Sequence, residues 1–316
     1  MSLSVGVVLV SLVHAFADYR AAVVEFAPQL AKDGATEVEI RFLKLQNLQR
    51  LEAFARLAKM NGSDIVVFPE YGITGDGYLV QDFTSRSLVQ PFLEELPEHI
   101  GNPCKQADEL PRSPSIVRAS CVASELQMVM VMNLLTRSSC NSSQYPACPS
   151  DGQLIHNTAV AFAETGSILK AYHKQHPYDL EHNFLDVPPA GQARARFKTS
   201  FGVEFGMFIC FDIFWESGFG IDDVEDFVFT TDWVNKPQWW SPSARVAQLA
   251  WSFWNQKNFL ASNYGGFGYN SSGSGIYHHG RILATFFNPS TEPESRLLIA
   301  DVPTSGTQRL QSSVMV

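Results

Sequence analysis

Three side chains in this sequence could together break an amide bond: Glu70, Lys174 and Cys210. A neutral thiol is a poor nucleophile near pH 7, and a neighbouring carboxylate such as Glu70 can take its proton as it attacks a carbonyl. A fixed cation such as Lys174 would stabilise the oxyanion of the tetrahedral intermediate. We therefore expect Cys210 to form a thioester, with Glu70 as general base and Lys174 beside the oxyanion.

Each of these side chains ends or follows an apolar run that is typical of a strand. The three runs cover residues 65–69, 168–174 and 205–210. The second run follows a glycine-containing turn at 164–167, which predicts a hairpin with residues 157–162. Because the carboxyl ends of strands converge on one rim of a layered α/β fold, we expect the three side chains to meet there. The alternatives are a capping or turn acid at Glu70 and an inert core thiol at Cys210.

The other predicted elements alternate between strands and helices, which indicates an α/β fold. Strands are predicted over residues 19–26, 128–134 and 260–264, and amphipathic helices over residues 43–60, 115–126 and 243–258. In the last helix, Trp254 shares a stripe with Ala247, Ala250 and Trp251, and we expect this stripe to be core. Residues 82–101 are predicted to be a peripheral segment, with Glu94, Glu95 and Glu98 on a solvated face.

Composition and charge limit the function classes. The 316 residues are 45% hydrophobic and 12% aromatic, enough for a large core. The net charge of −9 and the pI near 5.4 argue against binding to nucleic acid or anionic lipid. No cysteine or histidine pair has zinc-site spacing, and His173 and His176 lack a metal partner. We expect a small-molecule substrate, no metal and no cofactor.

The N-terminus predicts export. Residues 3–13 are apolar and Ala15-Phe16-Ala17 matches a signal-peptidase site, so residues 1–17 are predicted to be a signal peptide. The apolar run is too short to span a bilayer, and a first β-strand is the alternative. Three glycosylation sequons, which a secreted chain could use, begin at Asn61, Asn141 and Asn270.

The cysteines agree with a secreted chain. Four of the five cysteines cluster in the middle of the sequence, while Cys210 stands alone. In an oxidising compartment, the simplest pairing joins neighbours, Cys104 with Cys121 and Cys140 with Cys148. Four cysteines allow three connectivities, and the sequence does not choose among them.

The order of the three reactive side chains and their neighbours resembles the carbon–nitrogen hydrolase (nitrilase) superfamily, and within it the vanin and biotinidase branch. The motifs that carry the resemblance are Phe68-Pro69-Glu70, Tyr172-His173-Lys174-Gln175, Cys210-Phe211-Asp212-Ile213-Phe214-Trp215-Glu216, Tyr19-Arg20-Ala21-Ala22-Val23 and Ser274-Gly275-Ile276-Tyr277. The resemblance implies a nitrilase-type four-layer α-β-β-α sandwich over residues 18–300, followed by a polar tail at 301–316.

The resemblance also implies roles for further residues. Glu181 corresponds to a second glutamate that orients the lysine or polarises the water. Trp233 and Asn235 correspond to an aromatic and polar substrate wall, and Phe211 is a third candidate for substrate binding. Asp232 departs from the pattern, because the relatives carry a small residue there.

The implied activity is hydrolysis of a linear amide by a secreted enzyme, with pantetheine as the first substrate and biotinyl amides as the second. Members of the branch carry a further C-terminal domain, which we expect to be absent here. The sequence has no C-terminal hydrophobic tail of the kind that precedes a lipid anchor, so we do not expect one. A secreted binding protein that keeps the fold without catalysis is the alternative from another class. A papain-like protease would need a Cys–His pair instead. The sequence does not predict the oligomeric state.

Overall fold

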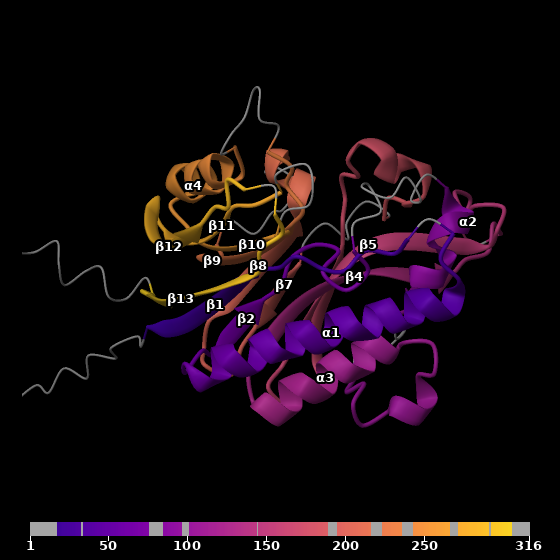
Figure 1. The fold of residues 1–316 in the computed structure, drawn as a ribbon, viewed down its shortest axis with the longest axis horizontal. Coiled ribbons are helices and arrows are strands. Elements are labelled where there is room, and N and C mark those ends of the chain that lie inside the picture. Colours follow the sequence, from indigo (N-terminus) through magenta and orange to yellow (C-terminus); the bar gives the residue numbers. More distant parts are fainter. Residues whose placement is uncertain are drawn as a thin grey trace, which may run out of the picture.

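Two β-sheets lie face to face between helices in the computed structural model of the chain (Figure 1). The structure describes residues 18–32, 34–75, 85–96, 101–143, 145–188, 195–215, 223–235, 243–265, 271–290 and 292–304. Helices α1 (Glu37–Met60) and α3 (Pro114–Leu126) cover one sheet, and α4 (Ser243–Asn255) covers the other (Figure 1). The predicted four-layer α-β-β-α sandwich is confirmed.

The first sheet has the strand order β13-β1-β2-β4-β5-β6, and β3 also pairs with β4. Within it β1, β2 and β4 run parallel, whereas β13, β5 and β6 pair antiparallel to their neighbours. Its strands are β1 (Tyr19–Glu25), β2 (Ile65–Val67), β3 (Glu94–Glu95), β4 (Val129–Ser139), β5 (Gln153–Phe162), β6 (Ile168–His173) and β13 (Arg296–Val302).

The second sheet has the order β12-β11-β10-β9-β8-β7, with β8, β9 and β10 parallel. Its strands are β7 (Arg196–Lys198), β8 (Glu204–Ile209), β9 (Asp226–Thr231), β10 (Asn258–Asn263), β11 (Ser274–His278) and β12 (Arg281–Phe286). Short helical turns complete the described structure: α2 (Arg86–Val89), η1 (Gln90–Phe92), η2 (Ala107–Glu109), η3 (Asp179–Asn183) and η4 (Cys210–Phe214).

The core includes two clusters on opposite faces of the first sheet, because successive side chains of a strand point to opposite faces. On β1, Ala21 and Val23 pack between the sheets with β8 residues such as Phe205 and Met207. Ala22 and Val24 pack in the other cluster, which includes side chains of α1 and α3. Since the central strands of both sheets are buried on each face, they read as nearly continuous apolar runs in the sequence.

Helix α1 begins at Glu37, earlier than the predicted residue 43, and ends at Met60 as predicted. Thr36 caps it: its side chain accepts from the Glu39 N–H, and the Glu39 carboxylate accepts from the Thr36 N–H at 2.7 Å. This reciprocal capping box satisfies two backbone donors that the first helical turn leaves unpaired. The apolar spacing alone did not reveal this first turn.

The prediction that Glu94 lies on a solvated face was wrong. Glu94 is buried, and its Oε1 lies 2.8 Å from Nζ of Lys44, which is also buried. Its Oε2 accepts hydrogen bonds from the N–H groups of Ser115 and Ile116 in the first turn of α3. Burial is tolerated because the carboxylate has both a cation and helix N-terminal donors. Glu95 is partly exposed as expected, and Glu98 lies outside the described residues.

The prediction that Trp254 belongs to a core stripe was also wrong, since 78% of this residue is exposed. The buried side of α4 includes Trp251 together with the polar side chains Gln248 and Ser252. Gln248 donates to the Gly273 carbonyl at 2.8 Å. Because buried polar partners orient the helix, an apolar stripe alone does not identify its buried side.

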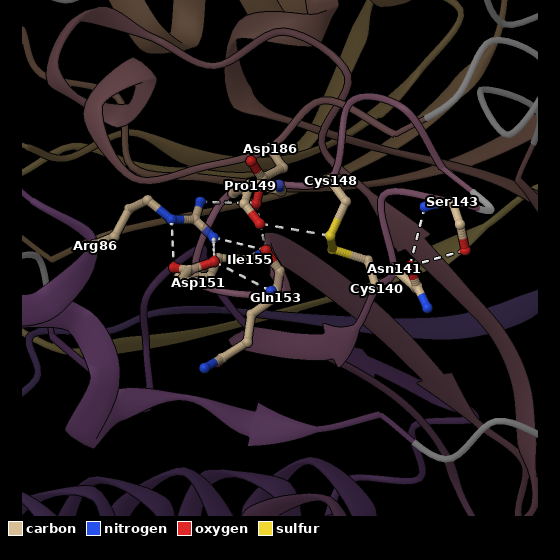
Figure 2. The surroundings of a disulfide bond; sticks show 10 residues. All are labelled: Arg86, Cys140, Asn141, Ser143, Cys148, Pro149, Asp151, Gln153, Ile155 and Asp186. Carbon is tan, nitrogen blue, oxygen red and sulfur yellow. Dashed lines mark hydrogen bonds and ion pairs between the residues drawn. A yellow bond between two sulfur atoms is a disulfide. The ribbon is translucent and has the colours of Figure 1, made fainter.

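The disulfides join the predicted neighbours, Cys104 with Cys121 and Cys140 with Cys148, and Cys210 is a buried free cysteine. Figure 2 shows the second bridge near Arg86, which forms ion pairs with Asp151 and Asp186 at 2.8 Å each.

The features related to export are only partly described. Asn61 and Asn141 are exposed, while Asn270 and the predicted signal peptide at 1–17 lie outside the described residues. None of the helices in the described ranges is long and apolar enough to cross a membrane.

Candidate active site

The structure brings Glu70, Lys174 and Glu181 into direct contact. Glu70 lies shortly after β2, Lys174 directly follows β6, and Glu181 lies in η3. Lys174 Nζ donates to Glu70 Oε1 and to Glu181 Oε2, each at 2.7 Å. All three residues are at most 3% exposed, so these ion pairs are shielded from water.

Cys210 is the first residue of the turn that follows β8, and it is 8% exposed. Its φ angle of 44° lies in the left-handed region that non-glycine residues rarely adopt. Strained backbone of this kind persists only where surrounding contacts determine it, and it is frequent at functional sites.

The peptide groups of Asp232 connect the carboxylate to the thiol. The Asp232 N–H donates to Glu70 Oε2 at 2.7 Å, and the Asp232 carbonyl accepts from Cys210 Sγ at 3.8 Å. Asp232 follows β9 of the second sheet, whereas Glu70 follows β2 of the first. The predicted meeting of strand ends therefore joins both sheets at one place.

A buried polar shell supports the two carboxylates. Asn157 on β5 donates through Nδ2 to Glu70 Oε1 at 2.7 Å and to Glu181 Oε1 at 3.2 Å. Its Oδ1 accepts from Asn133 Nδ2 at 2.6 Å, and Asn133 Oδ1 accepts the Tyr71 N–H at 2.9 Å. The Tyr71 hydroxyl donates to Glu181. This shell was not predicted from the sequence. The one signal for it was an amide side chain inside an apolar strand, since a buried amide requires hydrogen-bond partners.

The two glutamates differ in the number of donors they accept. Glu181 receives four: the Tyr71 hydroxyl and Asn157 at Oε1, and Lys174 and the Tyr178 N–H at Oε2. Glu70 receives two at Oε1 but only the Asp232 N–H at Oε2. A carboxylate offers about four acceptor positions. Among the described contacts, only Glu70 therefore keeps a position for a further proton.

The electrostatics of the site favour a neutral thiol and a charged lysine. Burial, together with the charge of Glu70, raises the pKa of Cys210 well above its ordinary value, against the opposing effect of Lys174. Burial also raises the pKa of Glu70, although Lys174 opposes this. Burial would lower the pKa of Lys174, but Glu181 and Glu70 outweigh it and raise that pKa well above its ordinary value. A neutral thiol needs a base in order to act as a nucleophile.

The predicted substrate-binding residues occupy different environments. Phe211 packs edge-on against Tyr178, with ring centres 5.0 Å apart, and Trp233 lies 5.7 Å from Phe214. Asn235 is buried, and its amide donates to the Ser272 carbonyl at 2.7 Å and accepts the Ala244 N–H at 3.0 Å. These bonds join the segment after β9 to α4 and to the segment before β11, rather than to Glu70, Lys174 or Cys210.

An aromatic cluster surrounds the turn that carries Cys210, and only part of it was predicted from the sequence. Besides Phe211 and Trp233 it contains three rings that are partly exposed, Tyr178, Phe214 and Trp215. The signal available in the sequence was the aromatic run directly after Cys210. No group of three His, Cys, Asp or Glu side chains in the described ranges is arranged to hold a metal ion.

Comparisons with known proteins agree with this architecture. Human pantetheinase is 33% identical over 294 residues, covering 90% of this chain and 55% of its own length. Rat biotinidase is 31% identical over 315 residues, covering 96% of this chain and 58% of its own length. The chain thus spans little more than half the length of these curated relatives.

Solved structures show the same fold. A Nesterenkonia amidase of the nitrilase superfamily superposes with a TM-score of 0.64 at 16% identity, covering 96% of this chain and all of its own. Residues 20–308 match the family Carbon-nitrogen hydrolase. With a family match over most of its length and relatives above 30% identity, this chain belongs to the carbon–nitrogen hydrolase family, in the branch of the pantetheinases and biotinidases.

Proposed function

We propose that the protein hydrolyses a linear carboxamide through a thioester on Cys210, with Glu70 as the general base and Lys174 as the oxyanion-stabilising group. One observation carries the proposal: Glu70 bonds at one oxygen to Lys174 and at the other to the Asp232 peptide that contacts the Cys210 thiol. The base, the cation and the nucleophile therefore share one buried site.

The proposed reaction has two stages. Cys210 Sγ attacks the amide carbon while its proton passes to the open position on Glu70 Oε2, and Lys174 stabilises the oxyanion. The C–N bond then breaks, Glu70 returns the proton to the amine, and the amine leaves. Water next attacks the thioester with Glu70 again as base, which releases the carboxylic acid and restores the thiol.

Glu181 has a supporting role in this proposal. The resemblance allowed it either to orient Lys174 or to polarise water. Since its four described donors fill its acceptor positions, we assign it the first role: a permanent anion that keeps Lys174 charged and in place.

Pantetheine is the first substrate that we propose, giving pantothenate and cysteamine, because pantetheinases are among the relatives with the highest identities given above. Biotinyl amides are second, from the likeness to biotinidase. The aromatic rings around Cys210 would contact the acyl chain, with Trp233 and Phe211 lining it and Asn235 supporting Trp233. We also propose that the protein is secreted, which agrees with its two disulfides and two exposed sequons.

Turnover of pantetheine and of a biotinyl amide tests the proposal, with wild type compared with Cys210→Ala. We expect hydrolysis of at least one amide by wild type and none by the variant. Equal inactivity of two folded proteins would instead support a binding protein that keeps the fold.

A papain-like mechanism is disfavoured by the histidines next to Lys174. His173 bonds to Thr158 and His176 to Asp212, rather than to Cys210. Activity that survives Lys174→Ala but not His176→Ala would reverse this assignment.

A further inference from the structure

Asp212 is a fully buried carboxylate in the turn that begins with Cys210. Its Oδ2 accepts the Ile209 N–H at 3.2 Å, so it braces the residue directly before the nucleophile. The same oxygen accepts the Tyr172 hydroxyl at 2.8 Å. Tyr172 lies on β6, two residues before Lys174.

The other oxygen of Asp212 binds the segment on the far side of Lys174. Its Oδ1 accepts the N–H groups of Gln175 at 3.2 Å and His176 at 2.9 Å. The ring Nδ1 of His176 lies 2.8 Å from the same oxygen. The partners of this one carboxylate therefore bracket Lys174 along the chain and reach the backbone next to Cys210.

These contacts explain how an unfavourable backbone conformation is maintained. Cys210 has a positive φ of 44°, which is unfavourable for a non-glycine residue and requires surrounding contacts that fix it. A buried carboxylate is also costly unless donors surround it. Asp212 satisfies both requirements at once, because its five described donors come from Ile209, directly before Cys210, and from the chain on both sides of Lys174.

We propose that Asp212 is a positioning residue that fixes the Cys210 thiol relative to Lys174; this rests on the proposed function of those two residues. Asp212 takes no proton in the reaction, since its described donors fill its acceptor positions. Its effect is geometric. A misplacement of about 1 Å between nucleophile and oxyanion cation can lower the rate roughly 100-fold without weakening substrate binding.

Asp212→Asn tests this inference, because it keeps the shape but turns one acceptor oxygen into a donor that faces N–H or O–H groups. We expect kcat to fall roughly 100-fold and KM to stay within about threefold. The rate of Cys210 alkylation by iodoacetamide should fall about tenfold, since the thiol moves away from its base. This second readout needs no amide turnover, so it still tests Asp212 if wild type proves inactive on both amides.

Asp226→Asn is the matched control. Asp226 is also a buried carboxylate, and it accepts from Tyr19 OH at 2.8 Å and from Asn258 Nδ2 at 2.7 Å, away from the proposed catalytic residues. We expect this variant to lose stability but to keep its kcat.

Tyr172→Phe removes only one donor to Asp212. If Asp212→Asn does not fold, this milder variant still tests whether Asp212 positions Cys210 relative to Lys174. It should lower kcat about tenfold at unchanged KM. Wild-type kcat and alkylation rate in a folded Asp212→Asn, or wild-type kcat in folded Tyr172→Phe, would overturn the inference. An equal loss of kcat in Asp226→Asn would overturn it as well.

Discussion

Glu70 and Glu181 bond to the same ammonium group, yet their surroundings suit the different roles that we propose for them. Both bond to Lys174 at 2.7 Å, but Glu181 accepts from four described donors, whereas the Asp232 N–H is the only donor to Glu70 Oε2 among the described residues. A group that must accept and return a proton needs an open position, and a group that only balances charge does not. The two carboxylates should therefore respond differently to the same substitution.

Glu70→Gln removes the proposed base, and we expect kcat/KM to fall by about 10²–10⁴. Glu181→Gln leaves the base but removes a charge that raises the pKa of Lys174. The alkaline limb of its kcat/KM profile, where Lys174 loses its proton, should therefore move to lower pH. Profiles of kcat/KM against pH for both variants check this. An equal loss in both, with the alkaline limb unmoved, would show that Glu181 also transfers protons.

Asn157→Leu should move the acid limb of the kcat/KM profile to higher pH. The substitution removes a donor shared by Glu70 and Glu181, so the ionised form of Glu70 is less stabilised and the pKa of Glu70 rises further. Since the base must be ionised, activity would be lost at a higher pH as the solution is acidified.

The control for this variant is Asn258→Leu, which removes a buried amide that bonds to Asp226 instead. We expect its acid limb to stay in place. An unmoved limb in Asn157→Leu would mean that Asn157 does not tune Glu70.

The sequence allowed Glu70, Lys174, Cys210 and Glu181 to be proposed for the site, but not the polar side chains that surround them. Glu70, Lys174 and Cys210 stand out because a reactive group ends or follows an apolar run and because the surrounding motifs resemble a family. Asn157 and Tyr71 have no such signature. Their partners, such as Glu181 in η3 and Asn133 on β4, are distant in the sequence, and those contacts exist only after the chain has folded.

At the scale of elements, apolar periodicity predicted helices and strands well and their polar contacts poorly. Helix α3 and strands β1, β6 and β8 lie close to the predicted ranges. Glu94 shows why polar contacts were predicted poorly, since an isolated acidic side chain is usually exposed to solvent. Its burial in β3 depends on Lys44 from α1 and on the first turn of α3, which are distant in the sequence.

Glu94→Ala should therefore destabilise the protein strongly. It leaves Lys44 buried without its carboxylate, which typically costs about 3–5 kcal/mol. The neighbouring Glu95→Ala is the matched control, because its pair with Arg112 is exposed and such pairs contribute about 0–1 kcal/mol. Urea unfolding of both variants measures the difference. The double change Lys44→Met with Glu94→Leu should recover much of the loss, and similar losses in the two single variants would contradict this account.

At the scale of the whole molecule, buried carboxylates connect the two sheets. Glu25 ends β1 in the first sheet and accepts from the Ser272 hydroxyl and from the N–H groups of Gly273 and Ser274, the last of which begins β11 in the second. Sequence alone could not predict this pairing, which spans 247 residues between Glu25 and Ser272. The same segment accepts the amide of Asn235, so Glu25 also supports the proposed substrate wall.

The contribution of Glu25 to the free energy of unfolding should decrease as the pH rises. Burial raises the pKa of Glu25 to about 7, although the donors at its oxygens oppose the shift. A raised carboxyl pKa means that the folded state binds the proton more tightly, so this contribution to stability is complete below the ordinary pKa of 4.5 and is lost as pH rises through about 7. Between pH 5 and pH 8, the loss is roughly 2–3 kcal/mol.

Glu25→Gln removes this dependence, because glutamine is neutral at every pH and can still bond to Ser272 and to the two N–H groups. From pH 5 to pH 8, wild type should lose roughly 2–3 kcal/mol of unfolding free energy relative to the variant. Urea unfolding at both pH values measures the difference, and Glu95→Gln, at a partly exposed carboxylate, should keep the wild-type dependence. Parallel curves for wild type and Glu25→Gln would show that Glu25 does not change protonation between these pH values. Because Ser272 also binds Asn235, a loss of substrate affinity in wild type over the same pH range, absent in the variant, would connect this titration to the proposed substrate wall.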